Sequence, residues 1–224
     1  MRVSGFATTR NFAGPLVRGA YAIRVTGAHR VPRRGPVLLV ANHGGIVDAT
    51  LLATISPRPV RVVTSGGVLP GLWQRASSAT GRIVVDVDPS SALRAAVSAL
   101  AAGHAVAMFP EGDLPGEQVP GLRSVLPGAA YVQVASGAPV LPVALLGTCG
   151  ERPTDPPRLR ADIDVVFGEA FTPAPPVDPR SRAGILEVSE AMRQGLADHL
   201  DIARARTARV DVPGVSSSGE DGAL

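Results

Sequence analysis

The sequence predicts an α/β fold, a single-domain αβα sandwich with a mostly parallel or mixed central sheet. Short runs of β-branched residues alternate with helical patterns along most of the 224 residues. These runs are apolar at nearly every position, as expected of strands that helices cover on both faces. The core must be aliphatic, because hydrophobic residues make up 45% of the chain and aromatic residues only 4%.

Six short runs rich in valine, isoleucine, leucine or alanine are the predicted strands: Val37–Val40, Val60–Val63, Ile83–Val87, Ala105–Phe109, Val140–Val143 and Ile163–Phe167. A helix is predicted to begin near Ile46. Another begins with Asp88 as the cap and Pro89 as the first helical residue, and stops at Gly103. Apolar residues at helical spacing predict two further helices, over Ala129–Ser136 and Ser181–Leu200.

One domain is predicted over residues 1–206, followed by a disordered tail over 207–224. Residues 1–34 contain seven arginines and no acidic residue, interspersed with apolar side chains. We expect this basic segment to form an arm on an anionic membrane surface. An ordinary solvated, arginine-rich surface is the open alternative. No stretch approaches the ~20 consecutive apolar residues that span a bilayer.

The sole cysteine, Cys149, excludes an intrachain disulfide and fits a reducing compartment. We therefore expect a cytoplasmic protein that lies peripherally on the inner face of the cell membrane. No Cys/His grouping indicates a zinc site, and a chain without lysine has no phosphate-binding Gly-Lys loop. The basic segment lacks a nucleic-acid docking motif. We expect no metal, no cofactor and no nucleic-acid partner.

A histidine and an aspartate, His43 and Asp48, follow the first predicted strand. On one continuous helix they would point about 140° apart, so we expect His43 in a loop and Asp48 in the first helical turn. The carboxylate would then accept the proton of one imidazole nitrogen and leave the other nitrogen as a base. In an open structural alternative, His43 only completes a turn and Asp48 only caps the helix.

A second polar group, Glu111, stands between Pro110 and Gly112 after another predicted strand. Ligand sites in α/β folds lie at the carboxyl ends of strands, so we expect both motifs in one site. A base, a group that orients it and a second polar group suit proton transfer from a hydroxyl.

With these motifs the chain resembles the lysophospholipid acyltransferase family, which includes the 1-acylglycerol-3-phosphate acyltransferases. The resemblance covers roughly residues 35–147. Its blocks are Asn42-His43 with Asp48, Leu69–Trp73, Gly81–Asp86, Phe109–Gly112, Gly128–Ala130 and Pro139–Val143, and Val166–Glu169 is similar to a later strand.

The resemblance implies a glycerolipid acyltransferase-like fold. It also implies O-acyl transfer from a thioester, acyl-CoA or acyl-carrier protein, to the hydroxyl of a lysophospholipid or related lipid. His43 is implied as the general base and Asp48 as its orienting group. The expected substrate-binding residues are Asn42, Pro110, Glu111, Gly112, Arg82 and Arg123. Alternatively, Glu111 only bonds backbone amides in a tight turn. Backbone amides beside Gly44-Gly45 or Gly112 are expected to stabilise the oxyanion.

The chain departs from the family where relatives that acylate glycerophosphate carry arginine or threonine. Val87, Asp113 and Leu114 stand at those positions, and none of them can bind phosphate as the arginine fork does. We therefore expect a neutral or zwitterionic acceptor, with Arg82 and Arg123 supplying positive charge from other loops. Two alternatives stay open: a non-catalytic lipid-binding module of the same fold, and a thioesterase-like hydrolase in which water replaces the alcohol.

Overall fold

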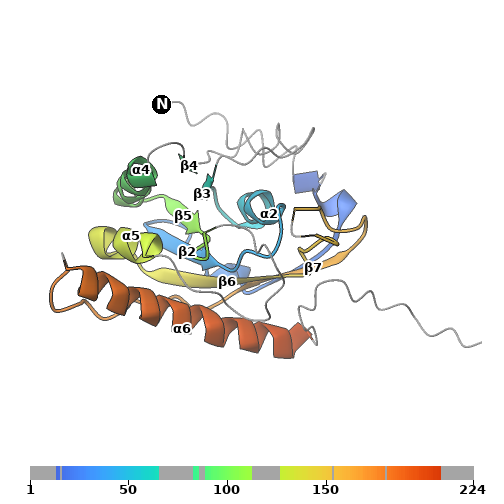
Figure 1. Ribbon diagram of the computed structural model, residues 1–224. Helices are drawn as coiled ribbons and strands as arrows, with labels where there is room; N and C mark the ends of the chain where they lie inside the picture. The colour runs from blue at the N-terminus through green and yellow to red at the C-terminus, as the bar shows by residue number, and fades with distance from the viewer. Residues whose placement is uncertain are drawn as a thin grey trace, which may run out of the picture.

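A computed structural model describes residues 14–15, 17–65, 83–85, 89–112, 127–152, 154–179 and 181–207. Within these ranges seven strands form one sheet, in the order β1-β7-β6-β2-β5-β3-β4 (Figure 1). The strands are β1 Ala22–Thr26, β2 Val37–Ala41, β3 Val60–Ser65, β4 Ile83–Val85, β5 Ala105–Met108, β6 Val140–Leu146 and β7 Asp162–Phe167. The helices are the short 3-10 helix η1 Ala28–Arg30, α2 Asp48–Ile55, α4 Pro89–Ala101, α5 Gly128–Ser136 and α6 Arg182–Thr207.

Strand β2 lies at the centre of the sheet and pairs in parallel with β5 on one side and β6 on the other. Strands β3 and β4 extend this parallel part beyond β5. Strand β7 runs antiparallel to β6, and β1 is parallel to β7. The predicted mixed α/β sheet is confirmed. The carboxyl ends of β2, β5 and β6 therefore meet at one edge of the sheet.

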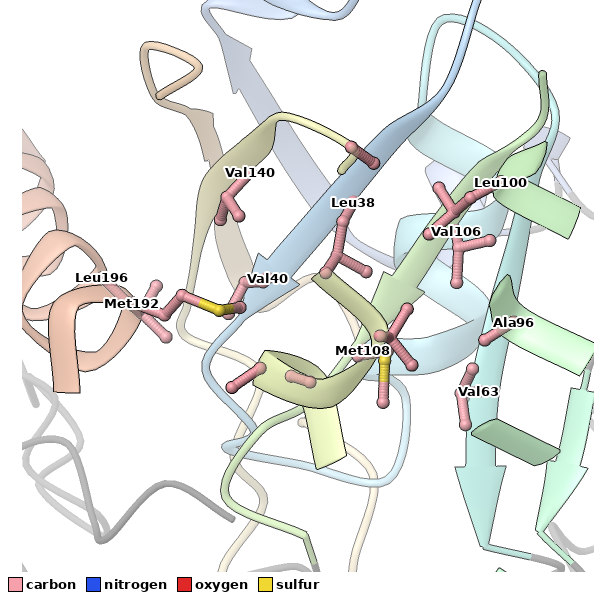
Figure 2. Packing of buried hydrophobic residues seen from close by; sticks show 14 of the residues in the cluster. Leu38, Val40, Val63, Ala96, Leu100, Val106, Met108, Val140, Met192 and Leu196 are labelled. Carbon is pink, nitrogen blue, oxygen red and sulfur yellow. The ribbon is translucent and has the colours of Figure 1, made fainter. Parts of the chain in front are cut away.

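Helices cover both faces of this sheet. Helices α4, α5 and α6 pack on one face, against strand residues that include Leu38 and Val40 (Figure 1). Figure 2 shows Met192 and Leu196 of α6 directed at Val40 in this layer. The alternate residues of β2, Val37, Leu39 and Ala41, face the other side of the sheet, where they pack with α2. Strands buried on both faces explain the continuous apolar runs in the sequence.

Strand β1 was not among the predicted strands, and it changes the interpretation of the basic segment. It pairs with β7, and the exposure of its residues alternates along the strand. Arg24 on β1 donates two hydrogen bonds, of 2.7 and 3.1 Å, to the buried carboxylate of Asp164. Val17 and Tyr21, just before β1, are buried in the core. Residues 17–34 of the basic segment thus pack into the domain, and contact of this segment with a membrane stays a prediction; residues 1–13 and 16 lie outside the described residues.

Helix α6 is longer than predicted and ends at Thr207, so this residue belongs to the helix rather than to the expected tail. Residues 208–224 lie outside the described part. His199 on α6 is buried, and its Nε2 lies 2.9 Å from the Val166 carbonyl oxygen. Among the described helices, none is long and apolar enough to cross a membrane.

Candidate active site

The loop that follows β2 carries His43 and leads directly into α2. The predicted loop position of His43 and the position of Asp48 in the first helical turn are both found. Helix α2 begins at Asp48 rather than near Ile46, because the preceding residues form a turn in which the Asp48 amide donates to the Gly45 carbonyl at 3.2 Å. This turn brings the Asp48 side chain back under the loop.

Three donors converge on one oxygen of the Asp48 carboxylate. His43 Nδ1 lies 2.9 Å from Oδ2, and the backbone amides of Gly44 and Gly45 donate to the same oxygen at 2.7 and 2.9 Å. A carboxylate oxygen accepts hydrogen bonds, so the Nδ1 of His43 carries the proton and Nε2 keeps its lone pair. Asp48 is fully buried, whereas the His43 side chain is 16% exposed. The geometry places the imidazole near the surface and the carboxylate beneath it.

These contacts correct the expectation for the oxyanion. The amides of Gly44 and Gly45 are already used by Asp48. The amide of Gly112 donates to the Phe109 carbonyl at 3.1 Å, in a turn where Gly112 has a φ of 85°. None of these three amides is available to stabilise a negative oxygen on the substrate.

Glu111 links the end of β5 to the end of β2. Its Oε1 accepts a hydrogen bond from the His43 backbone amide at 3.0 Å. Phe109, two residues earlier, stacks on the His43 ring, with 4.4 Å between ring centroids and 25° between planes. Pro110 between them is buried. Glu111 thus bonds a backbone amide, as its structural interpretation expected, although the amide belongs to the neighbouring strand end. Its contact with a substrate, like those of Pro110 and Gly112, stays a prediction.

Asn42, the residue before His43, is bonded through its side chain to β6. Its side-chain nitrogen donates to the Leu145 carbonyl at 2.9 Å, and its oxygen accepts from the Leu145 amide at 2.8 Å. Asn42 is only 8% exposed. These contacts explain Asn42 structurally, and a direct contact between Asn42 and substrate stays a prediction.

The chain after β6 packs closely against the other side of the loop. A Cβ atom on Gly45 would lie 2.1 Å from the Thr148 carbonyl oxygen, so only glycine fits at this position. Cys149 donates from its Sγ to the Gly44 carbonyl at 3.0 Å. The sequence around His43 predicted neither contact, because Cys149 lies 105 residues away from Gly44 along the chain.

Other expected site residues are not placed. Arg82, Arg123, Val87, Asp113 and Leu114 lie outside the described residues. Within the described ranges, no three His, Cys, Asp or Glu side chains are grouped so that they could hold a metal ion.

A protein-family model described as Acyltransferase matches residues 22–146, more than half of the chain. The chain belongs to the acyltransferase family. The match begins at β1 and ends at β6, so it includes His43, Asp48 and Glu111. The resemblance stated from the sequence is confirmed, and the protein is an acyltransferase enzyme.

The fold of this acyltransferase is also found among solved structures. It is similar to the crystal structure of the 1-acyl-sn-glycerophosphate (LPA) acyltransferase PlsC from Thermotoga maritima, with a TM-score of 0.67 and 19% sequence identity. The similarity covers 90% of this chain and 80% of that one. At this identity the likeness shows the shared fold.

Proposed function

We propose that this acyltransferase moves a fatty acyl group from a thioester, acyl-CoA or acyl-carrier protein, to the hydroxyl of a lysophospholipid or related lipid. The observation that carries the proposal is the 2.9 Å hydrogen bond between His43 Nδ1 and Asp48 Oδ2. This bond leaves the lone pair of Nε2 available to a substrate hydroxyl.

In the proposed reaction, His43 Nε2 takes the proton of the acceptor hydroxyl while its oxygen attacks the thioester carbonyl carbon. The tetrahedral intermediate then expels the thiolate, which receives the proton from the imidazolium as a thiol. The ester is formed, the thioester bond is broken, and His43 returns to its starting state without an acyl-enzyme. Asp48 keeps the ring oriented throughout. One positioned general base typically contributes ~10²–10⁴-fold to the rate.

The acceptor is proposed to be neutral or zwitterionic. Val87, Asp113 and Leu114 replace the arginine and threonine that glycerophosphate-acylating relatives carry, and Asp113 would repel a phosphate. Glu111 lies next to the base and is our candidate for a contact with the acceptor head group.

The acceptor is a lipid in this proposal, so the enzyme must reach a membrane surface. The anionic lipid surface on the inner face of the cell membrane remains our proposed partner. Arg24 and Arg30 contribute little to it, because they pair with Asp164 and Glu169 at 2.7 Å each. Membrane attraction would therefore come from the other basic residues of the first 34.

The test is a screen of donors against acceptors with wild type, His43→Ala and the control His29→Ala, an exposed histidine on η1. Acyl-CoA and acyl-carrier protein are paired with lysophosphatidic acid, lysophosphatidylcholine, monoacylglycerol or no acceptor. We expect ester formation with a lipid alcohol, loss of about 10²–10⁴-fold in His43→Ala, and unchanged activity in His29→Ala.

Each part of the proposal has its own contrary result. Ester formation by His43→Ala at the wild-type rate would show that His43 is not the base. A much faster reaction with lysophosphatidic acid than with every neutral or zwitterionic acceptor would contradict the acceptor class. Thioester consumption at the same rate without acceptor would identify a hydrolase.

A further inference from the structure

The end of β6 reaches beyond β2 at the active-site edge. The last residue of β2, Ala41, pairs with Val143, whereas β6 continues to Leu146. The side-chain amide of Asn42 bonds both the amide and the carbonyl of Leu145 on β6. Asn42 thus ties the chain just before His43 to β6, beyond the last paired residue of β2.

The same segment also holds the residues after His43. The Sγ of Cys149 donates to the Gly44 carbonyl at 3.0 Å. The Thr148 carbonyl packs on Gly45 so closely that a Cβ there would lie 2.1 Å from it. His43 therefore stands between two residues, Asn42 and Gly44, that are both bonded to one segment, Leu145–Cys149.

We propose that the segment Leu145–Cys149 holds the loop of His43 in the geometry for proton transfer, with Asn42 and Cys149 as positioning residues. This inference rests on the proposed role of His43 as the base. Asp48 already bonds the His43 ring, and Glu111 already bonds its backbone amide. Neither bond joins the loop to β6, so neither fixes the position of the loop relative to that strand. A displacement of about 1 Å at a reacting group can cost ~10²-fold in rate.

The first test changes Asn42→Asp, which keeps the size of the side chain. The carboxylate can still accept from the Leu145 amide, but it has no N–H for the Leu145 carbonyl and sets two acceptors against each other. We expect kcat per folded molecule to fall on the order of tenfold to a hundredfold, with KM within about twofold.

The matched control is Gln133→Glu, the same amide-to-carboxylate change at a buried position on α5. Gln133 is 5% exposed, and its Nε2 lies 3.5 Å from the Ala138 carbonyl. We expect this variant to lose thermal stability and to keep kcat per folded molecule within about twofold of wild type.

The second test uses the single cysteine of the chain, so that a thiol reagent acts at one position. Methyl methanethiosulfonate converts the Cys149 thiol to a disulfide and removes its S–H donor. We expect a fall in kcat that dithiothreitol reverses, and no effect of the reagent on Cys149→Ser. The Cys149→Ser variant keeps a donor for the Gly44 carbonyl and should retain activity, whereas Cys149→Ala should lose about tenfold.

The outcomes separate this inference from the proposed function. Full activity of His43→Ala would overturn the proposed function. An inactive His43→Ala together with wild-type kcat in Asn42→Asp and Cys149→Ala would overturn the positioning role alone. So would an equal loss in Asn42→Asp and Gln133→Glu. If Asn42→Asp does not fold, thiol modification of the wild-type protein decides the question.

Discussion

His43 is held through its ring and its backbone by different parts of the chain. Asp48 bonds the ring from the next helix, Phe109 stacks on the ring from the end of β5, and Glu111 bonds the backbone amide. A side chain constrained in this way loses little further freedom when a substrate binds, which favours catalysis by orientation. Two of these contacts come from the end of β5 and one from α2, which follows β2, so the pairing of β2 with β5 supplies much of the alignment.

The two roles of Glu111 can be separated by two substitutions. Glu111→Gln keeps an oxygen for the His43 amide, so kcat should stay within about threefold, while KM for the acceptor rises if the carboxylate binds the head group. Glu111→Ala removes the hydrogen bond to His43 and should lower kcat by about tenfold or more. Steady-state kinetics with varied acceptor measures both parameters. An unchanged KM in Glu111→Gln would leave Glu111 with a structural role only.

For single residues, the sequence predicted the hydrogen bond between His43 and Asp48, which are close together along the chain. His43 and Asp48 lie five residues apart, and their hydrogen bond followed from a loop, two glycines and a helix start. The bond from the His43 amide to Glu111 spans 68 residues, and the bond from Cys149 to Gly44 spans 105. Such contacts depend on strand order and register, which the motifs do not encode. The use of the Gly44 and Gly45 amides by Asp48 is local as well, but it was not predicted, because the sequence does not show in which direction these amides point.

Helix α6 crosses the face of the sheet that α4 and α5 also cover (Figure 1). The buried residues of its inner face include Val188, Met192, Leu196 and Leu200. His199, next to this stripe, reaches the edge of β7 and bonds the Val166 carbonyl. Burial lowers the pKa of His199, an effect increased by the charges of Arg30 and Arg206 and opposed by the hydrogen bond to Val166.

This lowered pKa predicts a pH dependence of stability. His199 binds a proton more readily in the unfolded chain than in the folded one, so stability rises with pH. The contribution is complete above the unfolded pKa of about 6.5 and is lost as the pH falls below it towards the folded pKa. Thermal unfolding of wild type and His199→Gln between pH 8 and 5 measures the effect. The decline should be smaller in His199→Gln, and identical declines would contradict the assignment.

The strands of the sheet centre and the edge strand β4 were predictable, whereas the other edge strand, β1, was not. Strands such as β2, β5 and β6 are buried at every residue and appear in the sequence as continuous apolar runs. Strand β1 is an edge strand with alternating exposure, and Arg24 interrupts its pattern. Its place in the sheet depends on pairing with β7 and on the ion pair with Asp164, which lies 140 residues away.

The molecule as a whole brings three strand ends to one edge of a mixed sheet. The parallel pairing of β2 with β5 and β6 accounts for this arrangement. Strand β7 returns antiparallel to β6, and the chain between these two strands brings Thr148 and Cys149 beside the loop of His43. A ligand site at the carboxyl ends of parallel strands follows the general pattern of α/β folds.

Membrane association is a prediction about the whole molecule. Seven of the 22 basic residues lie within residues 1–34. Arg24 and Arg30 pair with acidic side chains, and the other five are the proposed contact with anionic lipid. The protein should sediment with vesicles containing phosphatidylglycerol more than with neutral phosphatidylcholine vesicles, and added salt should release it. Substitution of Arg2, Arg10 and Arg18 by glutamine should weaken binding. Equal binding to both vesicles would contradict an electrostatic contact.

The central claim is that Asp48 fixes the proton of the His43 ring on Nδ1 and leaves Nε2 as the base. Long-range ¹H–¹⁵N NMR of protein labelled in its four histidines, at pH about 8, reports which ring nitrogen carries the proton. His199 is an internal reference of the opposite kind, because its Nε2 must donate to the Val166 carbonyl. We predict the Nδ1–H form for His43, assigned by its absence in His43→Gln, and the Nε2–H form for His199. An Nε2–H form of His43 would contradict the account.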